Sequence, residues 1–384
     1  MTDARPFHAL TRMRSATPAQ ALVVLHVALA IVNSLTLWPV PRRLLVLVGV
    51  LILAYEAIGF RSMKQEQIFL YVLGAWIAAA LTLNGVFFGE WVQESVYLPG
   101  NIGVALALCR GHVSRRVAGG MFYLIAAYFG YRLVTVSSPG AIHQILVTGS
   151  ANGISGFMIL LCCLYYAVTR ADGARVGLLP ALTCLVVSAL TLGRSGMVAA
   201  GLLLAGMAIY DLFAERRARL LAAKLVVYAT VTTLALVLLL PRLDLISFVF
   251  ERFAEFGLGS EARDRIWSAY GEGLAGPALL IGHGREQVFA GFTNVHNSYI
   301  LWHKSMGLMA VPLYVLAAAA LLRALVRDWL LFILLGALLF RSASDEVVLP
   351  FRLFDFVFYY LVCTILVTLP ARRASPSLLQ PAEA

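Results

Sequence analysis

Long apolar runs alternate with short polar segments along almost the whole chain. An α-helix rises about 1.5 Å per residue, so an apolar run of about 20 residues can cross the hydrocarbon core of a bilayer. We therefore expect an all-α, polytopic integral membrane protein, with one membrane domain over residues 1–384 and about twelve transmembrane helices. The predicted spans are 19–38, 44–60, 68–88, 98–109, 117–136, 149–168, 176–193, 196–213, 225–240, 299–322, 329–342 and 353–370.

Some boundaries carry a particular expectation. The run 19–38 follows three arginines, as in a signal peptide, but it is too long and lacks a small-residue cleavage pattern, so we predict a retained first span. The spans 98–109 and 329–342 are short. Pro99-Gly100-Asn101 opens the first of these two, and a helix can be interrupted there.

Composition excludes several classes of protein. Hydrophobic residues make up 61% of the chain and charged residues 13%, against roughly 45–50% and 25% in soluble domains. An outer-membrane barrel would show short segments of alternating polarity instead. The net charge is +10, and we assign the excess to basic loops at a membrane surface, so membrane lipids are expected contacts and nucleic acid is not. The five cysteines lie in apolar runs and are read as small core residues.

The distribution of basic residues predicts the orientation in the membrane. One alternate set of loops and tails holds 18 of the 30 Lys and Arg residues. On the other side, loops 89–98 and 137–148 hold none, and Arg42 and Arg43 are placed in a tight turn. Cytoplasmic loops carry the excess of Lys and Arg in membrane proteins, so we expect both termini in the cytoplasm.

One extracytosolic loop, 241–298, is far longer than ordinary connections. Its first part, 243–256, has an apolar stripe at helical spacing, which suits a helix on the membrane surface or one packed over the bundle. Ser260 can cap a second helix from about Glu261 to Leu274. Residues 279–292 form a glycine-punctuated loop.

Charged groups near a bilayer are costly and point to function. Several of them are predicted on the extracytosolic side: Arg132, Arg194, Arg263, Arg265 and His296 with Asn297. Guanidinium groups that converge on one membrane face suit a phosphate or diphosphate, through forked, charge-assisted hydrogen bonds.

These residues resemble a known family. Arg194-Ser195 in a late turn, a large outer loop with Arg265-x-Trp267 and Ile281-Gly282-His283-Gly284, and His296-Asn297-Ser298-Tyr299 entering a span are similar to the bacterial O-antigen ligase and O-antigen polymerase superfamily. The motifs cover roughly residues 185–320. Asn152 opens a span as in polymerase relatives, but the usual basic residue before it is missing, and it is given no role.

The resemblance implies a metal-independent glycosyltransferase of the bacterial inner membrane. The donor would be a glycan on undecaprenyl diphosphate, and the acceptor a glycan or lipid A-core. Polymerisation of O-antigen or exopolysaccharide repeat units is favoured, because the segment 295–303 is closer to polymerase relatives; O-antigen ligation is the alternative. A lipid-linked sugar transporter is the alternative of another class.

The resemblance also implies residue roles. Arg194 and Arg265 inherit the diphosphate-binding role, and His296 the role of assisting the acceptor hydroxyl, so that His296 and Arg265 are the catalytic residues. We add Arg263 and Arg132 as further diphosphate ligands on the basis of their predicted side of the membrane. Asn297 and His303 are supporting residues.

The chemistry of the residues agrees with these roles but leaves plainer alternatives open. A diphosphate leaving group needs positive charge, and the chain has no Asp-x-Asp pair to hold a metal, so no cofactor is expected. A histidine suits proton transfer from a hydroxyl near neutral pH. Alternatively, His296 and Asn297 only cap a helix, Arg265 pairs with Glu261 one turn away, and Arg132 and Arg194 extend to the lipid headgroups.

Overall fold

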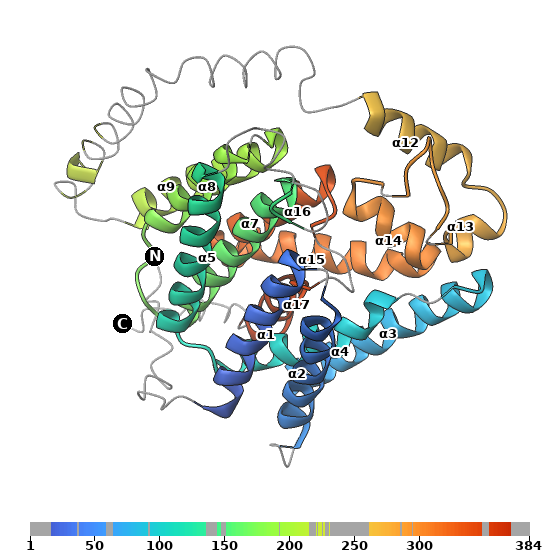
Figure 1. Cartoon of the computed structure of the whole chain (residues 1–384). Helices are drawn as coiled ribbons and strands as arrows, with labels where there is room; N and C mark the ends of the chain where they lie inside the picture. Colours follow the sequence, from blue (N-terminus) through green and yellow to red (C-terminus); the bar gives the residue numbers. More distant parts are fainter. Residues whose placement is uncertain are drawn as a thin grey trace, which may run out of the picture.

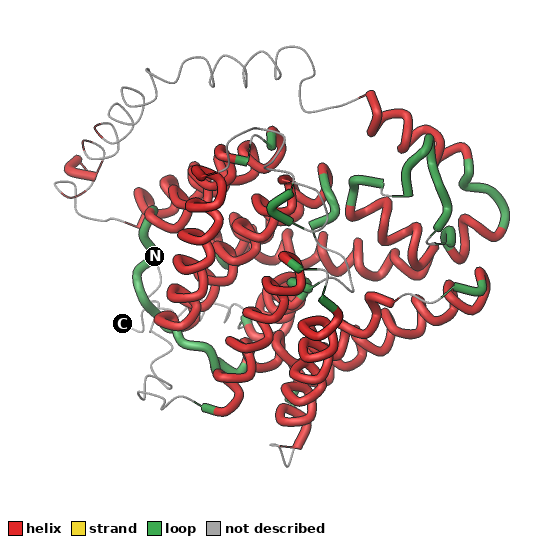
Figure 2. The backbone as a smooth tube through the Cα atoms, viewed as in Figure 1, coloured by secondary structure: helices red, strands yellow, loops and turns green. Residues whose placement is uncertain are grey.

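The computed structural model describes residues 17–36, 38–58, 64–90, 93–135, 144–146, 151–191, 193–214, 220, 222–224, 226, 230, 261–284, 286–293, 295–347 and 353–369. Within these residues the protein consists of helices and loops without a strand, as the tube in Figure 2 shows. The prediction of an all-α fold is confirmed.

The helices are named in chain order as in Figure 1. They are α1 (Pro18–Leu35), α2 (Pro39–Ile58), α3 (Gln65–Phe88), η1 (Gln93–Tyr97), α4 (Leu98–Cys109), α5 (Arg115–Thr135), α7 (Ala151–Ala171), α8 (Leu179–Leu190), α9 (Arg194–Ala214), α12 (Glu261–Glu272), α13 (Pro277–Ile281), α14 (Ser298–Met306), η3 (Gly307–Ala310), α15 (Val311–Arg327), α16 (Trp329–Ser344), α17 (Phe356–Cys363) and the short π-helix η4 (Thr364–Thr368).

Six helical segments of the described chain are long and apolar enough to cross a membrane. They are Pro18–Leu35, Gln65–Phe88, Arg115–Thr135, Asn152–Ala171, Arg194–Phe213 and Ser298–Arg327. Shorter apolar helices occupy Ser95–Cys109, Leu179–Leu190, Trp329–Ser344 and Phe356–Thr368. The predicted span 225–240 falls largely, and the apolar stripe 243–256 entirely, outside the described residues.

The structure differs from the sequence-based expectations at the starts of α4 and α2 and within the span 299–322. Pro99-Gly100-Asn101 does not interrupt its span, because the proline lies in the first turn of α4, where its missing N–H costs little. Arg42 and Arg43 do not form a turn; they lie in the first turns of α2, which starts at Pro39. The span 299–322 is divided into α14, η3 and α15. Helix α14 ends at Met306, because its C-cap Gly307 has a φ of 56°, outside the right-handed α-helical region.

The bundle has two groups of helices, each around a buried helix (Figure 1). In the first group α4 packs against α1, α2, α3 and α17. Its Gly100 meets Gly49 of α2 so closely that a Cβ at Gly49 would lie 2.6 Å from the Gly100 Cα atom. Such close crossings of small residues are typical of helices packed in membranes.

In the second group α7 packs against α5, α8, α9 and α16. Helix α16 also contacts α14, α15 and α17, so it joins the second group to the C-terminal helices. The start of α7 and the end of α16 meet in this arrangement, and the polar residues described below lie there.

Candidate active site

The His-Asn-Ser-Tyr motif fastens the start of α14 to the end of α16. Asn297 caps α14, since its side-chain oxygen accepts from the backbone N–H groups of Tyr299 at 2.9 Å and Ile300 at 3.2 Å. Its amide nitrogen donates to the Ala343 carbonyl at 2.9 Å, in the last turn of α16. Asn297 therefore caps α14, which was one of the two alternatives from the sequence, and it also forms a hydrogen bond with α16.

The next two residues of the motif bind the same segment. The buried Ser298 hydroxyl donates to the Asp345 carbonyl at 2.9 Å and accepts from the Val347 N–H at 3.0 Å. The Tyr299 hydroxyl donates to the Leu339 carbonyl at 2.8 Å. Three consecutive side chains of the motif thus hold the 339–347 segment, which sets the position of His296 relative to Asp345.

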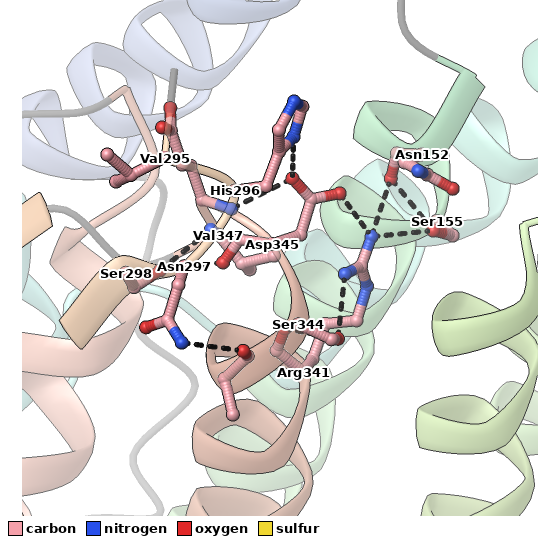
Figure 3. A network of polar contacts seen from close by, with 12 residues as sticks. Asn152, Ser155, Val295, His296, Asn297, Ser298, Arg341, Ser344, Asp345 and Val347 are labelled. Carbon is pink, nitrogen blue, oxygen red and sulfur yellow. Dashed lines mark hydrogen bonds and ion pairs between the residues drawn. The ribbon is translucent and has the colours of Figure 1, made fainter. Parts of the chain in front are cut away.

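His296 faces the Asp345 carboxylate, with 3.9 Å between Nδ1 and Oδ1 (Figure 3). Its side chain is 35% exposed, so part of the ring can be reached by solvent or a ligand. The backbone of His296 has a φ of 50°, in the left-handed region, where histidine is more common than most residues. Such a conformation costs on the order of 1–3 kcal/mol and persists where neighbouring contacts enforce it.

Asp345 lies between His296 and the fully buried Arg341 (Figure 3). Arg341 Nη2 donates to Asp345 Oδ2 at 2.9 Å, and the two residues are one helical turn apart. Burial would raise the pKa of the Asp345 carboxyl, but contacts with His296 and Arg341 and the Glu346 N–H outweigh burial and hold the pKa well below its usual range. Asp345 is therefore ionised at neutral pH.

Arg341 also joins α16 to the start of α7. Its Nη2 lies 3.2 Å from the Asn152 carbonyl oxygen and 3.4 Å from Ser155 Oγ. Its Nη1 donates to Ser344 Oγ at 3.3 Å. With these acceptors and no exposed surface, Arg341 serves to hold Asp345 in place and does not present its guanidinium to a ligand.

Arg194 is the first residue of α9 and is half-buried. The chain on both sides of it packs tightly on α7: a Cβ at Gly193 would overlap the Asn152 side chain, and one at Gly196, in the first turn of α9, would lie 2.6 Å from Ser155 Cβ. Glycine at both positions allows α9 to start beside α7. The starts of α7, α9 and α14 therefore surround this site, and the partial positive charge of helix N-termini favours an anion there.

Helix α12 brings Arg263 to the same site. Trp267 Nε1 donates to the Val295 carbonyl at 2.9 Å, directly before His296. Ile266, Tyr270, Phe289 and Val295 form a small core, separate from that of the bundle, beneath the helix. Burial lowers the pKa of Arg263, the Arg341 and Arg194 cations lower it further, and Asp345 opposes them. Asp345, Arg341 and Arg194 thus all lie within electrostatic range of Arg263.

The remaining predicted site residues lie elsewhere or serve as contacts between helices. Arg265 is exposed on α12, and Arg132 is exposed in the last turn of α5. His303 receives a hydrogen bond at Nδ1 from Tyr270 Oη at 2.6 Å and donates from Nε2 to the Leu279 carbonyl at 3.0 Å. A carbonyl can only accept, so the second contact assigns this tautomer, and His303 fastens α12 and α13 to α14.

Sequence reasoning missed Arg341 and Asp345. A charged residue at the end of an apolar run, followed one turn later by a carboxylate, is the signal that could have identified the pair. Asn152, which had no assigned role, lies in this network through its backbone carbonyl.

No protein-family model, curated protein or solved structure matches this chain.

Proposed function

We propose that this protein is a membrane glycosyltransferase that transfers a glycan from undecaprenyl diphosphate to an acceptor hydroxyl. The observation that carries the proposal is the His296–Asp345 pair, which Arg341 holds in place, together with Arg263, which lies within electrostatic range of both Asp345 and Arg194. Positive charge at one end of a membrane bundle suits the diphosphate of a lipid-linked donor. The histidine-carboxylate pair beside it suits a glycosyl acceptor whose hydroxyl group must lose a proton.

In the proposed reaction, the acceptor hydroxyl attacks the anomeric carbon of the donor. The new glycosidic C–O bond forms as the bond between that carbon and the phosphate oxygen breaks. The hydroxyl proton moves to His296 Nε2, and the diphosphate leaves with the electron pair of the broken bond. Arg194 and Arg263 supply the positive charge that stabilises the leaving diphosphate.

Asp345 prepares His296 for this step. A neutral imidazole with its proton on Nδ1, toward the Asp345 carboxylate, leaves Nε2 as the proton acceptor. After proton transfer, the same carboxylate stabilises the imidazolium. Arg341 keeps Asp345 ionised and oriented.

The site is proposed to face the periplasm, in an inner-membrane protein with twelve spans, cytoplasmic termini and a periplasmic loop over 241–298. The charge distribution of the loops supports this orientation. Polymerisation of repeat units is the favoured reaction, and ligation to lipid A-core uses the same chemistry. Clustering of the polar groups at one end favours an enzyme over a transporter, whose site would lie near the bilayer midplane.

A gene deletion combined with analysis of lipid-linked glycans tests the proposal. Loss of a polymerase leaves single repeat units on the carrier or on the core, whereas loss of a ligase leaves long glycan on the carrier and none on lipid A. If the donor instead stays in the cytoplasmic leaflet, the transporter function is correct and the proposal fails. Purified protein in proteoliposomes, supplied with lipid-linked donor, should extend or transfer the glycan.

A further inference from the structure

The segment 277–283 belongs to the loop that the sequence places in the periplasm. Its contacts, however, are with residues inside α3 and in the last turn of α14, away from the His296 end of that helix, which places it at the depth of the apolar helices. The Asn84 amide of α3 donates to the Ile281 carbonyl at 2.8 Å. Asn84 lies four residues before the end of α3, or about 6 Å of helix rise. The α3 residues beyond it, Val86 and Phe87, are apolar and exposed, as expected of a helix still in contact with hydrocarbon.

Contacts with the end of α14 place the segment 277–283 at a similar depth. Gly307 packs directly on the Leu280 carbonyl, with no room for a Cβ between them. Gly307 follows the start of α14 by nine residues, or roughly 13 Å of helix rise. Leu280 therefore lies about two and a half turns from the His296 end of that helix, beside η3, which leads into the apolar helix α15.

Side-chain and backbone groups of α3 and α14 form hydrogen bonds with the backbone of this segment, as a low-dielectric environment requires. The Leu279 carbonyl accepts from His303 Nε2 at 3.0 Å, and the Ile281 carbonyl from Asn84. The His283 N–H donates to the Lys304 carbonyl at 2.8 Å. In water, solvent would satisfy such groups, whereas within the bilayer every backbone polar group needs a partner in the protein.

The side chains complete the pattern, because the residues that point away from the bundle are apolar. Leu279 is 44% exposed and Leu280 58% exposed. They continue the exposed apolar surface of the neighbouring helices, formed by Val86 and Phe87 of α3 and by Leu308 and Val311 next to α14. Figure 1 shows α13 beside the C-terminal part of α3.

We propose that 277–283 is a re-entrant segment that enters the outer leaflet, with Leu279 and Leu280 in contact with lipid acyl chains. The partner of this surface is the hydrocarbon of the bilayer. This inference is independent of the proposed glycosyl transfer, since it uses no residue of that reaction. Helix α12, which carries Arg263, is only four residues from α13. Insertion of α13 into the bilayer would therefore fix the distance between α12 and the membrane surface.

A fluorescent probe at position 280 tests the proposal. Leu280→Cys carries an environment-sensitive fluorophore in proteoliposomes of phosphatidylethanolamine and phosphatidylglycerol that contain acyl-chain spin-labelled phosphatidylcholine. The matched control is Ser268→Cys, on the exposed face of α12. The parent protein, treated in the same way, gives the background from the five native cysteines.

The Leu280 adduct should emit at shorter wavelength than the Ser268 adduct and be quenched by the spin-labelled lipid, with little quenching by aqueous iodide. The Ser268 adduct should show the reverse. If both adducts are quenched by iodide and spared by the spin-labelled lipid, the segment is an aqueous loop and the proposal is wrong. Should Leu280→Cys fail to fold, Leu279→Cys carries the same test, because Leu279 is also exposed on α13.

Discussion

Replacing Asp345 by asparagine removes one negative charge between His296 and the buried Arg341 without changing the shape of the side chain. Arg341 keeps the Asn152 carbonyl and the Ser155 hydroxyl as acceptors. The loss of stability should therefore be smaller than the roughly 3–5 kcal/mol that follows when a buried charge loses its partner entirely. A charge-assisted hydrogen bond contributes about 1.5–3 kcal/mol and a neutral one about 0.5–1.5, so we expect a loss of about 1–2 kcal/mol.

The effect on turnover should be much larger. The asparagine amide can donate to His296 Nδ1, which places the imidazole proton on Nε2 and leaves no acceptor for the hydroxyl proton. A positioned general base typically contributes about 10²–10⁴-fold, so Asp345→Asn should lower the rate by that factor. The assay is glycan transfer from lipid-linked donor in proteoliposomes, with thermal unfolding in detergent measured on the same preparation. Glu272→Gln, at the exposed end of α12, removes one negative charge outside the site and is the control.

The pH dependence of the stability difference adds a second check. The folded-state pKa of Asp345 is below the ordinary value of 3.8, so this carboxylate contributes stability above that value, and the contribution is lost as the pH falls through the folded-state pKa. In a His296→Ala background, which removes the neighbouring imidazole, the stability difference between proteins with and without Asp345→Asn should be constant from pH 8 to about 5 and shrink only under more acidic conditions. Wild-type turnover by a folded Asp345→Asn protein would refute the assigned role.

Four further predictions follow from the site. His296→Ala should lose turnover by at least about tenfold while the donor lipid still binds, as measured by single-turnover assays and donor co-purification; a stable, fully active variant would leave only the structural role. Arg263→Ala should weaken donor binding more than the exposed Arg265→Ala, and the opposite order would favour the motif-based assignment. Turnover should be equal with and without EDTA, because arginines supply the positive charge; loss of activity restored by Mg²⁺ would contradict this. Ser268→Cys should react with a membrane-impermeant thiol reagent in cells with an intact inner membrane, and labelling only after lysis would reverse the topology.

The helical fold could be predicted because apolar length and helix rise are properties of short segments. The division of 299–322 could not, since it depends on the contact of Gly307 with Leu280, a residue of the preceding loop. The expectation that Pro99 could interrupt a span was wrong because the outcome, too, depended on structure outside the local sequence. A proline disrupts a helix interior but fits the first turn, and only the start of α4 at Leu98 decides between the two.

Part of the site could also be predicted from local sequence. His296, Asn297 and Ser298 are adjacent, so one motif identifies them together. Their partner Asp345 is 49 residues after His296 and across a helix boundary, and nothing in the intervening sequence records that the two helix ends meet. Arg341 was overlooked because a single basic residue at the end of an apolar run has the same appearance as an ordinary topology signal.

The choice between Arg263 and Arg265 shows how helix geometry limits a motif. The two residues are two positions apart on α12, so their side chains point about 200° apart, and both cannot face the same site. Trp267 and Ile266 fix the rotation of the helix by packing against Val295 and Phe289. With that rotation, Arg263 is half-buried within electrostatic range of Asp345, while Arg265 is exposed. We therefore expect a donor bound at Arg263 to leave α12 in place, whereas bringing Arg265 to the position of Arg263 would require the helix to turn and the Trp267 hydrogen bond to break.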